Sequence, residues 1–291
     1  MTDLIVDQRR SLNVPHMLPA APRVLAVGSI AARALLRAHG HAVPLAAFPE
    51  APYLRAGEEI IWVGVRPRSM HPRMLAIAEP IASGTPITVD LTGVAPSPNH
   101  QHRRDAATIR ILVARCAALR RRLAEVETPR GFAPLLVDRT PAFPLDLAAP
   151  IVHRFVAALA SNDLSRIEAT AIPLLGLGSG LTPSGDDLVG GALFARGLLS
   201  AADAAWQRFG ERVIAIAPSR THEISAALLT DLIHGATYGV LHAMVDALVE
   251  RCPFDQVIDA TRSLTAIGHS SGWDMLTGFL FAMATASPTK V

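Results

Sequence analysis

The chain has 291 residues and a formal net charge of +2, and half of its residues are hydrophobic. This length gives room for one large domain or for two smaller ones, each with its own core. So small a net charge gives no argument for binding to nucleic acid or to a membrane surface. Few aromatic residues beside abundant alanine and leucine favour close-packed helices over a large sheet.

The chain is predicted to be cytoplasmic. Residues 1–10 have neither the order nor the apolar centre of a signal peptide. The mean hydropathy is positive, but the longest apolar runs, such as 275–286, are shorter than a membrane-spanning helix requires. Cys116 and Cys252 have no metal-binding spacing, so we expect both to be free thiols.

The first third of the chain alternates short apolar runs with turn residues, as β-rich units do. Three of these runs predict strands, at 24–27, 59–65 and 86–90. A short helix is predicted over 29–38, where the apolar residues share one face. We therefore expect a small β-rich domain over residues 1–102.

A prolyl loop in this domain carries four basic side chains, Arg66, Arg68, His71 and Arg73. Guanidinium groups match carboxylate and phosphate oxygens bidentately, so the loop could be an anion clamp that reaches toward the second half of the chain. The alternative is a solvated basic loop, which is the commoner arrangement.

The turn-rich stretch 92–102 predicts a linker. His100 and His102 lie two residues apart in it, a spacing that can serve a metal ion. No third ligand is visible nearby, and the sequence alone therefore predicts no metal site here.

Helical periodicity dominates the rest of the chain, beginning with an amphipathic helix over 104–127 whose arginines lie opposite its apolar face. Prolines interrupt the pattern between 128 and 150. Further helices are predicted at 151–159, 164–171, 185–199, 202–217, 221–234, 238–250, 255–267 and 272–286. The predicted fold class is α+β, with a smaller β-rich N-terminal domain followed by a mainly α-helical domain over 103–291.

The most unusual stretch, residues 174–187, reads LLGLGSGLTPSGDD and leads into an apolar helix. Its alternating glycines permit positive φ and leave room for a ligand against the backbone. Ser184 with Asp187 has the spacing of a capping box, and such a helix start attracts anions. Capping and helix packing explain Ser184, Gly185 and Asp187 equally well, but they do not explain the alternating glycines or Asp186.

A second stretch, residues 268–282, repeats the first. When Ser184 is aligned with Ser271, the Ser-Gly pair, the second aspartate (Asp187 with Asp274) and several later residues coincide. One loop-to-helix unit used twice could build a single site from both halves of a domain. The alternative is that small residues recur wherever helices pack closely.

These two motifs resemble those of the AllH-type subunit family of oxamate carbamoyltransferase, long filed as a domain of unknown function. The resemblance covers roughly residues 172–284. It implies a part in an enzyme of several subunits that exchanges a carbamoyl group between oxamate and phosphate during allantoin breakdown. Members with other genetic partners could act differently.

Carbamoyl transfer needs amide donors for the developing oxyanion, positive or dipolar groups for phosphate, and a group that manages a proton. The candidate catalytic residues are His269, Asp187 and Asp274. The candidate substrate-binding residues are Gly178, Ser179, Gly180, Thr182, Ser184, Gly185, Asp186, Thr221, Ser225, Ser270, Ser271 and Gly272.

Thr221 and Ser225 fall one turn apart on one helical face, although Thr221 serves equally well as an N-cap. His222 beside them is the nearest candidate for proton transfer in that segment. No cofactor follows from the sequence. Asp186 and Asp187 could hold a divalent cation such as Mg²⁺ through water, or they could orient a substrate amide through its N–H donors, and no direct metal-ligand set is predicted.

The expected function is that of a subunit in a carbamoyltransferase complex, with a small anionic substrate (oxamate or oxalurate, and carbamoyl phosphate) and other protein subunits as partners. Neither nucleic acid nor a membrane is an expected partner. Two alternatives stay open: a non-catalytic anion-binding or assembly subunit, and a stand-alone enzyme that processes an amide.

Overall fold

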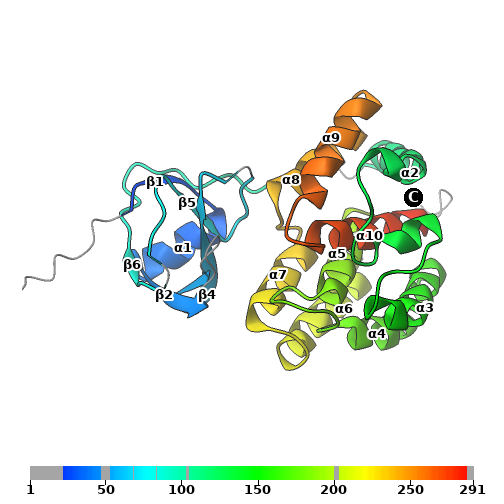
Figure 1. Cartoon of the computed structure of the whole chain (residues 1–291), viewed down its shortest axis with the longest axis horizontal. Helices are drawn as coiled ribbons and strands as arrows, with labels where there is room; N and C mark the ends of the chain where they lie inside the picture. The colour runs from blue at the N-terminus through cyan, green and yellow to red at the C-terminus, as the bar shows by residue number, and fades with distance from the viewer. Residues whose placement is uncertain are drawn as a thin grey trace, which may run out of the picture.

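The computed structural model describes residues 22–46, 53–67, 69–82, 84–102, 105–199 and 203–286. A β unit is followed by a larger helical unit, and the two lie side by side (Figure 1). The predicted α+β fold class, with the smaller β-rich part first, is confirmed. The predictions made for residues 1–10, Arg68 and Arg104 lie outside the described ranges.

The β unit contains a six-stranded sheet in the order β1-β5-β4-β3-β2-β6. Neighbouring strands are antiparallel except β4 and β5, which pair in parallel. The elements of this unit are β1 (Val24–Val27), α1 (Ser29–Arg37), β2 (His41–Ala46), β3 (Tyr53–Ala56), β4 (Glu59–Val65), β5 (Met74–Ile77) and β6 (Ile87–Thr88).

The sheet buries both of its faces because side chains alternate along each strand. On β4, Ile61 and Val63 pack with α1 in one cluster. Ile60 and Trp62 point to the other face and pack with Ile224 of the helical unit. A strand buried on both faces reads as a continuous apolar run, which is why the sequence predicts β4 correctly.

At the centre of the helical unit lie two helices, α5 (Ser184–Leu199) and α10 (Ser271–Ala284), and the other helices pack around them (Figure 1). The described residues contain no helix long and apolar enough to cross a membrane. The other helices are α2 (Ala106–Arg121), α3 (Ala149–Ser161), α4 (Leu164–Ala171), α6 (Ala204–Ile216), α7 (Glu223–Ile233), α8 (Gly239–Val249) and α9 (Phe254–Thr265).

The predicted helices are confirmed with small differences at their ends, except that the helix predicted over 104–127 ends at Arg121 and a short 3-10 turn follows it at Leu123–Glu125. The strands at 24–27 and 59–65 are confirmed, and the third is shorter than predicted. The pattern did not indicate β2, β3 and β5. Strand β2 contains Pro44 and is bulged against β3, features that disguise a strand in sequence.

Arg73 connects the two units. Its guanidinium is buried and donates to Asp231 of α7 (Nη2 to Oδ1, 2.8 Å) and to Glu59 of β4 (Nη1 to Oε2, 2.7 Å). Arg66 donates to the carbonyl of Ala78. Arg73 therefore reaches the helical half as the anion-clamp hypothesis expects, but the acid that it binds belongs to the protein. The anion-clamp and solvated-loop interpretations are both wrong for this residue.

Candidate functional site

The site predicted from the repeated motif lies where α5 and α10 begin. The two helices approach closely at equivalent glycines: a Cβ atom on Gly191 would overlap with the carbonyl oxygen of Met275, and one on Gly278 with that of Leu188. Gly191 aligns with Gly278, and Leu188 with Met275, in the repeat. The two copies therefore contact each other through the same residues, related by an approximate two-fold axis.

Hydroxyl groups join the two helix starts. The Oγ1 of Thr182 lies 3.0 Å from the Oγ of Ser271, and the Oγ of Ser184 lies 3.3 Å from the Oγ of Ser270. Ser184 also hydrogen-bonds Asp274, while Ser271 hydrogen-bonds Asp187. Each copy thus supplies a hydroxyl to the aspartate of the other.

Asp187 and Asp274 form a buried acidic pair. Burial raises the pKa of Asp187 well above its ordinary range, and the nearby Asp274 raises it further. Burial also raises the pKa of Asp274, to about 7, although the amide N–H of Phe132 donates to its Oδ1 at 2.7 Å. Among the residues that the structure describes, the Oδ2 atoms of both aspartates have no hydrogen-bond partner. An unpaired buried carboxyl oxygen costs free energy unless it is protonated or finds a partner.

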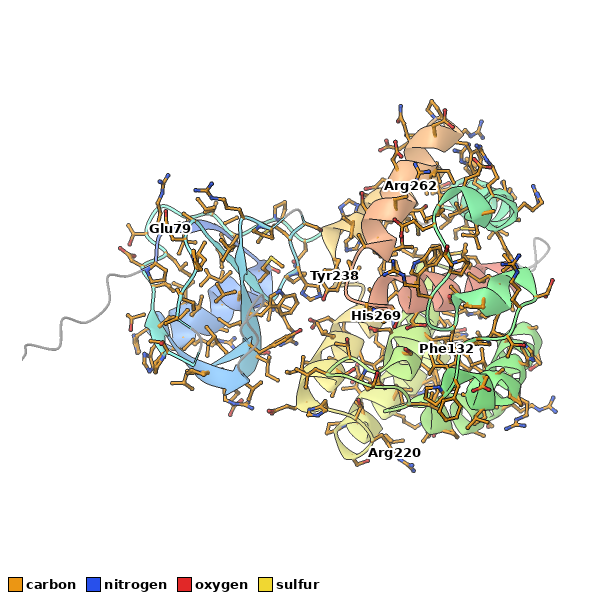
Figure 2. The ribbon with its side chains drawn as sticks, in the orientation of Figure 1. Glu79, Phe132, Arg220, Tyr238, Arg262 and His269 are labelled. Carbon is orange, nitrogen blue, oxygen red and sulfur yellow. The ribbon has the colours of Figure 1, made fainter. Side chains whose placement is uncertain are left out.

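The pair lies near the junction of the two units. The charge of Asp187 contributes to the raised pKa of both Tyr53 and Tyr238, for which burial is the largest cause. Tyr238 lies at that junction (Figure 2) and contacts the ring of His71, with centroids 4.7 Å apart. Asp187, the α5 member of the pair, is therefore electrostatically coupled to the face where the β unit packs.

Asp186 has a different set of partners from Asp187. Its Oδ1 accepts from the amide of Gly176 at 2.8 Å, and its Oδ2 accepts from the hydroxyls of Thr221 and Ser225. Thr221 and Ser225 do share a face, as predicted, and that face is directed at Asp186. The carboxylate of Asp186 fastens the glycine-rich loop to the start of α7. Asp187 instead accepts from Ser271, so the two aspartates that were predicted to share a Mg²⁺ ion have different hydrogen-bond partners.

The glycine-rich loop is exposed at Gly178, Ser179 and Gly180. Gly176, Gly178 and Gly180 all have positive φ, at 77°, 122° and 90°, as the sequence predicts. A cavity of about 530 Å³ lies beside the loop, lined by Gly176, Gly178, Gly180, Pro183 and residues 218–223. The loop thus presents backbone to an open space, while the second loop, 268–272, does not line that cavity.

Gly185 and Gly272 align in the repeat, and each lies closely packed against backbone in the first turn of its helix. A Cβ atom on either would overlap with a backbone carbonyl, that of Leu174 or of Leu264. Their amides are already used, since Gly185 donates to Leu177 at 2.8 Å and Gly272 to Ile267 at 3.1 Å. An anion at these helix starts would therefore depend on the loop amides and the hydroxyls rather than on these two N–H groups.

The capping-box interpretation is wrong. The carbonyl of Pro183, not of Ser184, accepts the first helical hydrogen bond, from Asp187 N–H at 3.3 Å. Ser184 lies inside the helix and is buried, with its hydroxyl directed at the other copy. The Ser184 hydroxyl and the Asp187 carboxyl, which would form a capping box, instead make contacts between the two helix starts.

The two candidate histidines are exposed. His269 lies in the turn before α10 (Figure 2), where its carbonyl oxygen is 3.5 Å from Arg130 Nη1. His222 lies at the N-cap of α7 without capping it through its side chain, and it lines the cavity beside the glycine-rich loop. Neither histidine reaches the buried carboxyl pair through a hydrogen bond given by the structure.

A second cluster, which the sequence did not predict, contains His100, His102 and His242. The rings of His100 and His242 stack with centroids 4.5 Å apart, and His102 Nε2 lies 2.9 Å from His242 Nδ1. Burial lowers the pKa of His242 to about 3, with smaller contributions from His102 and His100. The spacing of His100 and His102 was the only signal in the sequence, because the third histidine is distant along the chain.

The fold and these helix starts define a class of protein: a β unit joined to a helical domain whose two central helices begin with one duplicated serine-glycine-aspartate motif. Residues 174–283 match the family model described as oxamate carbamoyltransferase subunit AllH. The resemblance to the AllH family that the two motifs predict is therefore confirmed over these residues. No curated protein and no solved structure matches the chain.

Proposed function

We propose that this chain is a subunit of a carbamoyltransferase and that its paired helix starts form part of the site of carbamoyl transfer. The observation that carries the proposal is the buried pair Asp187 and Asp274: each aspartate accepts a serine hydroxyl from the other copy and has one buried oxygen that lacks a hydrogen-bond partner among the described residues. The match of residues 174–283 to the AllH family model supports the same reaction class. Other subunits and a small anionic substrate are parts of this proposal.

The chemistry fits the needs of the reaction. Negative charge grows on the carbonyl oxygen in the transition state, and exposed amides of the loop around Gly178 and Gly180 can donate to it. A carboxyl group whose pKa is about 7, as for Asp274, can hold or release the amine proton near neutral pH. Asp187 would keep the pair from carrying two charges, because two close carboxylates disfavour each other's ionisation. His269, in the exposed turn before α10, is the proposed second acid–base group.

The test uses the reconstituted complex. Asp187→Asn and His269→Ala, made singly, should abolish turnover without loss of subunit assembly. His153→Ala, at an exposed histidine of α3, is the matched control and should change neither turnover nor assembly. Loss of assembly with Asp187→Asn, or full turnover with both variants, would contradict a catalytic role.

The non-catalytic alternative gives a different result in the same assay. If the helix starts only hold an anion or dock a partner, both variants weaken assembly or change nothing. Turnover by the purified chain alone would instead indicate a stand-alone amide-processing enzyme.

A further inference from the structure

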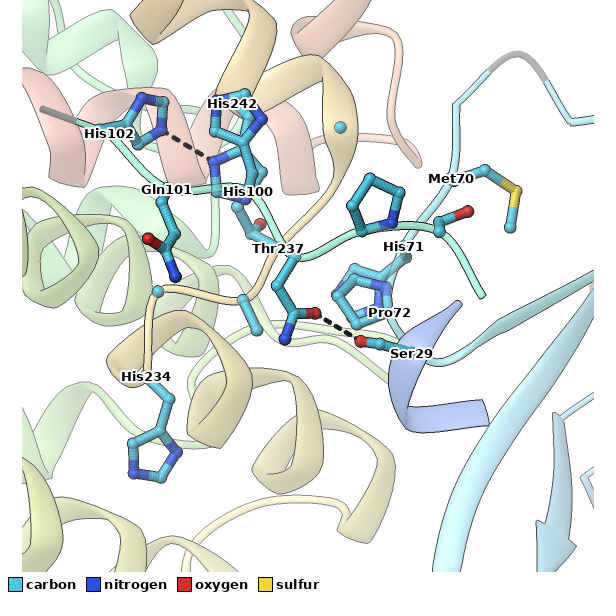
Figure 3. Close-up of a pocket in the computed structure, with 16 residues that line it drawn as sticks. Ser29, Met70, His71, Pro72, His100, Gln101, His102, His234, Thr237 and His242 are labelled. Carbon is cyan, nitrogen blue, oxygen red and sulfur yellow. Dashed lines mark hydrogen bonds between the residues drawn. The ribbon is translucent and has the colours of Figure 1, made fainter. Parts of the chain in front are cut away.

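Three histidines converge at one end of a cavity of about 650 Å³ between the two units (Figure 3). His100 and His102 come from the segment that follows the sheet, and His242 comes from α8. One ligand atom from each lies within 4.8 Å of the other two. Imidazoles gathered this closely repel each other when protonated, and as neutral groups they present lone pairs to one point.

The backbone explains why all three reach this point. His100 and His102 lie two residues apart in one segment, and their ring centroids are 4.5 Å apart. His242 projects from the first turn of α8, and Asp246 lies one turn later on the same face of the helix. The carboxylate of Asp246 holds both linker histidines, with its Oδ2 2.9 Å from His100 Nε2 and its Oδ1 3.1 Å from His102 Nδ1.

This arrangement matches the outer shell of a metal site. A ligating histidine usually donates its second ring N–H to a carboxylate, which fixes the ring and selects the nitrogen that faces the metal. For His102 the second nitrogen contacts Asp246, and its Nε2 faces His242 Nδ1 at 2.9 Å. Two nitrogens bound to one tetrahedral Zn²⁺ lie about 3.3 Å apart, since each Zn–N bond is about 2.05 Å. A small rotation of either ring would lengthen the distance between His102 Nε2 and His242 Nδ1 from 2.9 Å to about 3.3 Å, the separation that tetrahedral Zn²⁺ requires.

We propose that His100, His102 and His242 bind one divalent transition-metal ion, with Zn²⁺ the best match, and that Asp246 orients two of the three rings. Three imidazole nitrogens favour Zn²⁺ and its neighbours in the first transition row over Mg²⁺ or Ca²⁺, which prefer oxygen ligands. Because all three histidines line the cavity, a fourth position stays open to water or to a small ligand, as in catalytic rather than structural zinc sites.

The proposal is independent of the carbamoyl-transfer site. His102 hydrogen-bonds His242 and Asp246, and Asp246 also pairs with His100, whereas the hydroxyl network and the carboxyl pair lie at the starts of α5 and α10. Loss of either site in an experiment would therefore leave the other proposal standing.

The test is metal binding by the full-length chain without an affinity tag, made metal-free with a chelator and titrated with Zn²⁺ against a chromophoric competitor. We expect one ion per chain. Asp246→Asn should weaken binding about 10- to 100-fold, and His102→Ala or His242→Ala should weaken it more. Co²⁺ should give visible absorption bands of a low-coordinate, nitrogen-rich site in the wild type and lose them in the histidine variants.

His234→Ala is the matched control, because His234 lines the same cavity apart from the cluster (Figure 3). It should bind Zn²⁺ as the wild type does. His100→Ala, at a side chain that is 38% exposed, should weaken binding without disturbing the fold, and circular dichroism would verify this. No saturable binding to the wild type, or equal affinity in the control and all three histidine variants, would overturn the proposal and leave a hydrogen-bonded histidine–aspartate network.

Discussion

The starts of α5 and α10 carry the same motif, but the surrounding protein uses them differently. The shared serines and the later shared glycines, Gly191 and Gly278, make contacts between the two copies, and each shared second aspartate accepts a serine hydroxyl of the other copy. At the position before that aspartate, α5 has Asp186, which ties its loop to α7, and α10 has Trp273, which is fully buried. Shared serines therefore take part in both hydroxyl contacts between the copies, while Asp186 and Trp273, which differ, connect each copy to its own surroundings.

The difference extends to solvent. The loop before α5 has positive-φ glycines and lines a cavity, whereas the start of α10 is covered by the segment at Gly131 and Phe132. A Cβ atom on Gly131 would overlap with the carboxyl of Asp274, and the amide of Phe132 donates to that carboxyl. The duplicated unit thus has one copy whose loop lies beside a cavity, the open copy, and one copy whose aspartate is covered, the covered copy.

The largest expected effect comes from the covered copy and depends on pH. An unfolded aspartate has a pKa of about 3.9, and the pKa of Asp274 in the native state is about 7. Between these values the native state keeps a proton that the unfolded state has lost, so stability falls as pH rises through this window and levels off above it. Each pH unit is worth up to about 1.4 kcal/mol at this residue.

Asp274→Asn cannot ionise and keeps an oxygen for the Phe132 amide. We expect urea unfolding at a series of pH values to show a clearly flatter profile for this variant and greater stability than the wild type at pH 8, with the remaining slope due to Asp187. Asp255→Asn, at a side chain that is 94% exposed, controls for the loss of one charge. A wild-type profile that rises with pH over the window would contradict the raised pKa.

The contact between the copies can be broken at Gly278. A methyl group there would overlap with the carbonyl oxygen of Leu188, so Gly278→Ala should destabilise the protein by about 3 kcal/mol, the upper end of overpacking effects. Gly197→Ala on α5, where a Cβ atom meets nothing within 4 Å, should be neutral or stabilising by up to about 1 kcal/mol. Thermal or urea unfolding measures both, and equal effects would show that the helices do not approach as closely as described.

Asp186→Ala tests the connection between the glycine-rich loop and α7, which is present in the open copy and has no equivalent at Trp273 in the covered copy. It removes the acceptor for the Gly176 amide and for the hydroxyls of Thr221 and Ser225. We expect a loss of about 2 kcal/mol, because these partly buried donors are left unpaired. Hydrogen exchange should speed up in residues 176–183 and at the start of α7 while the start of α10 stays protected. Uniform loss of protection would indicate that Asp186 stabilises the whole domain instead.

How far the sequence predicts this molecule depends on the range of the interactions. Helix and strand patterns are local, so the helices and β4 follow from spacing alone, and the repeat is visible because Ser184 and Ser271 begin matching strings. Local periodicity does not predict contacts between segments that are distant along the chain. The approach of His242 to His102, the pairing of Arg73 with Asp231, and the orientation of Asp186 toward α7 all needed the tertiary structure.

The smallest expected effect compares one position in the two copies. Thr182 and His269 align in the repeat, but Thr182 is half-buried and its hydroxyl contacts Ser271 at 3.0 Å, whereas His269 is exposed. Thr182→Ala should cost about 1 kcal/mol, the typical net value of a hydrogen bond. His269→Ala should change stability by less than about 0.5 kcal/mol, as exposed substitutions do. Urea unfolding of the two variants measures the contrast, and a large loss in His269→Ala would mean that its ring supports the turn, so that lost turnover in this variant could no longer be attributed to chemistry.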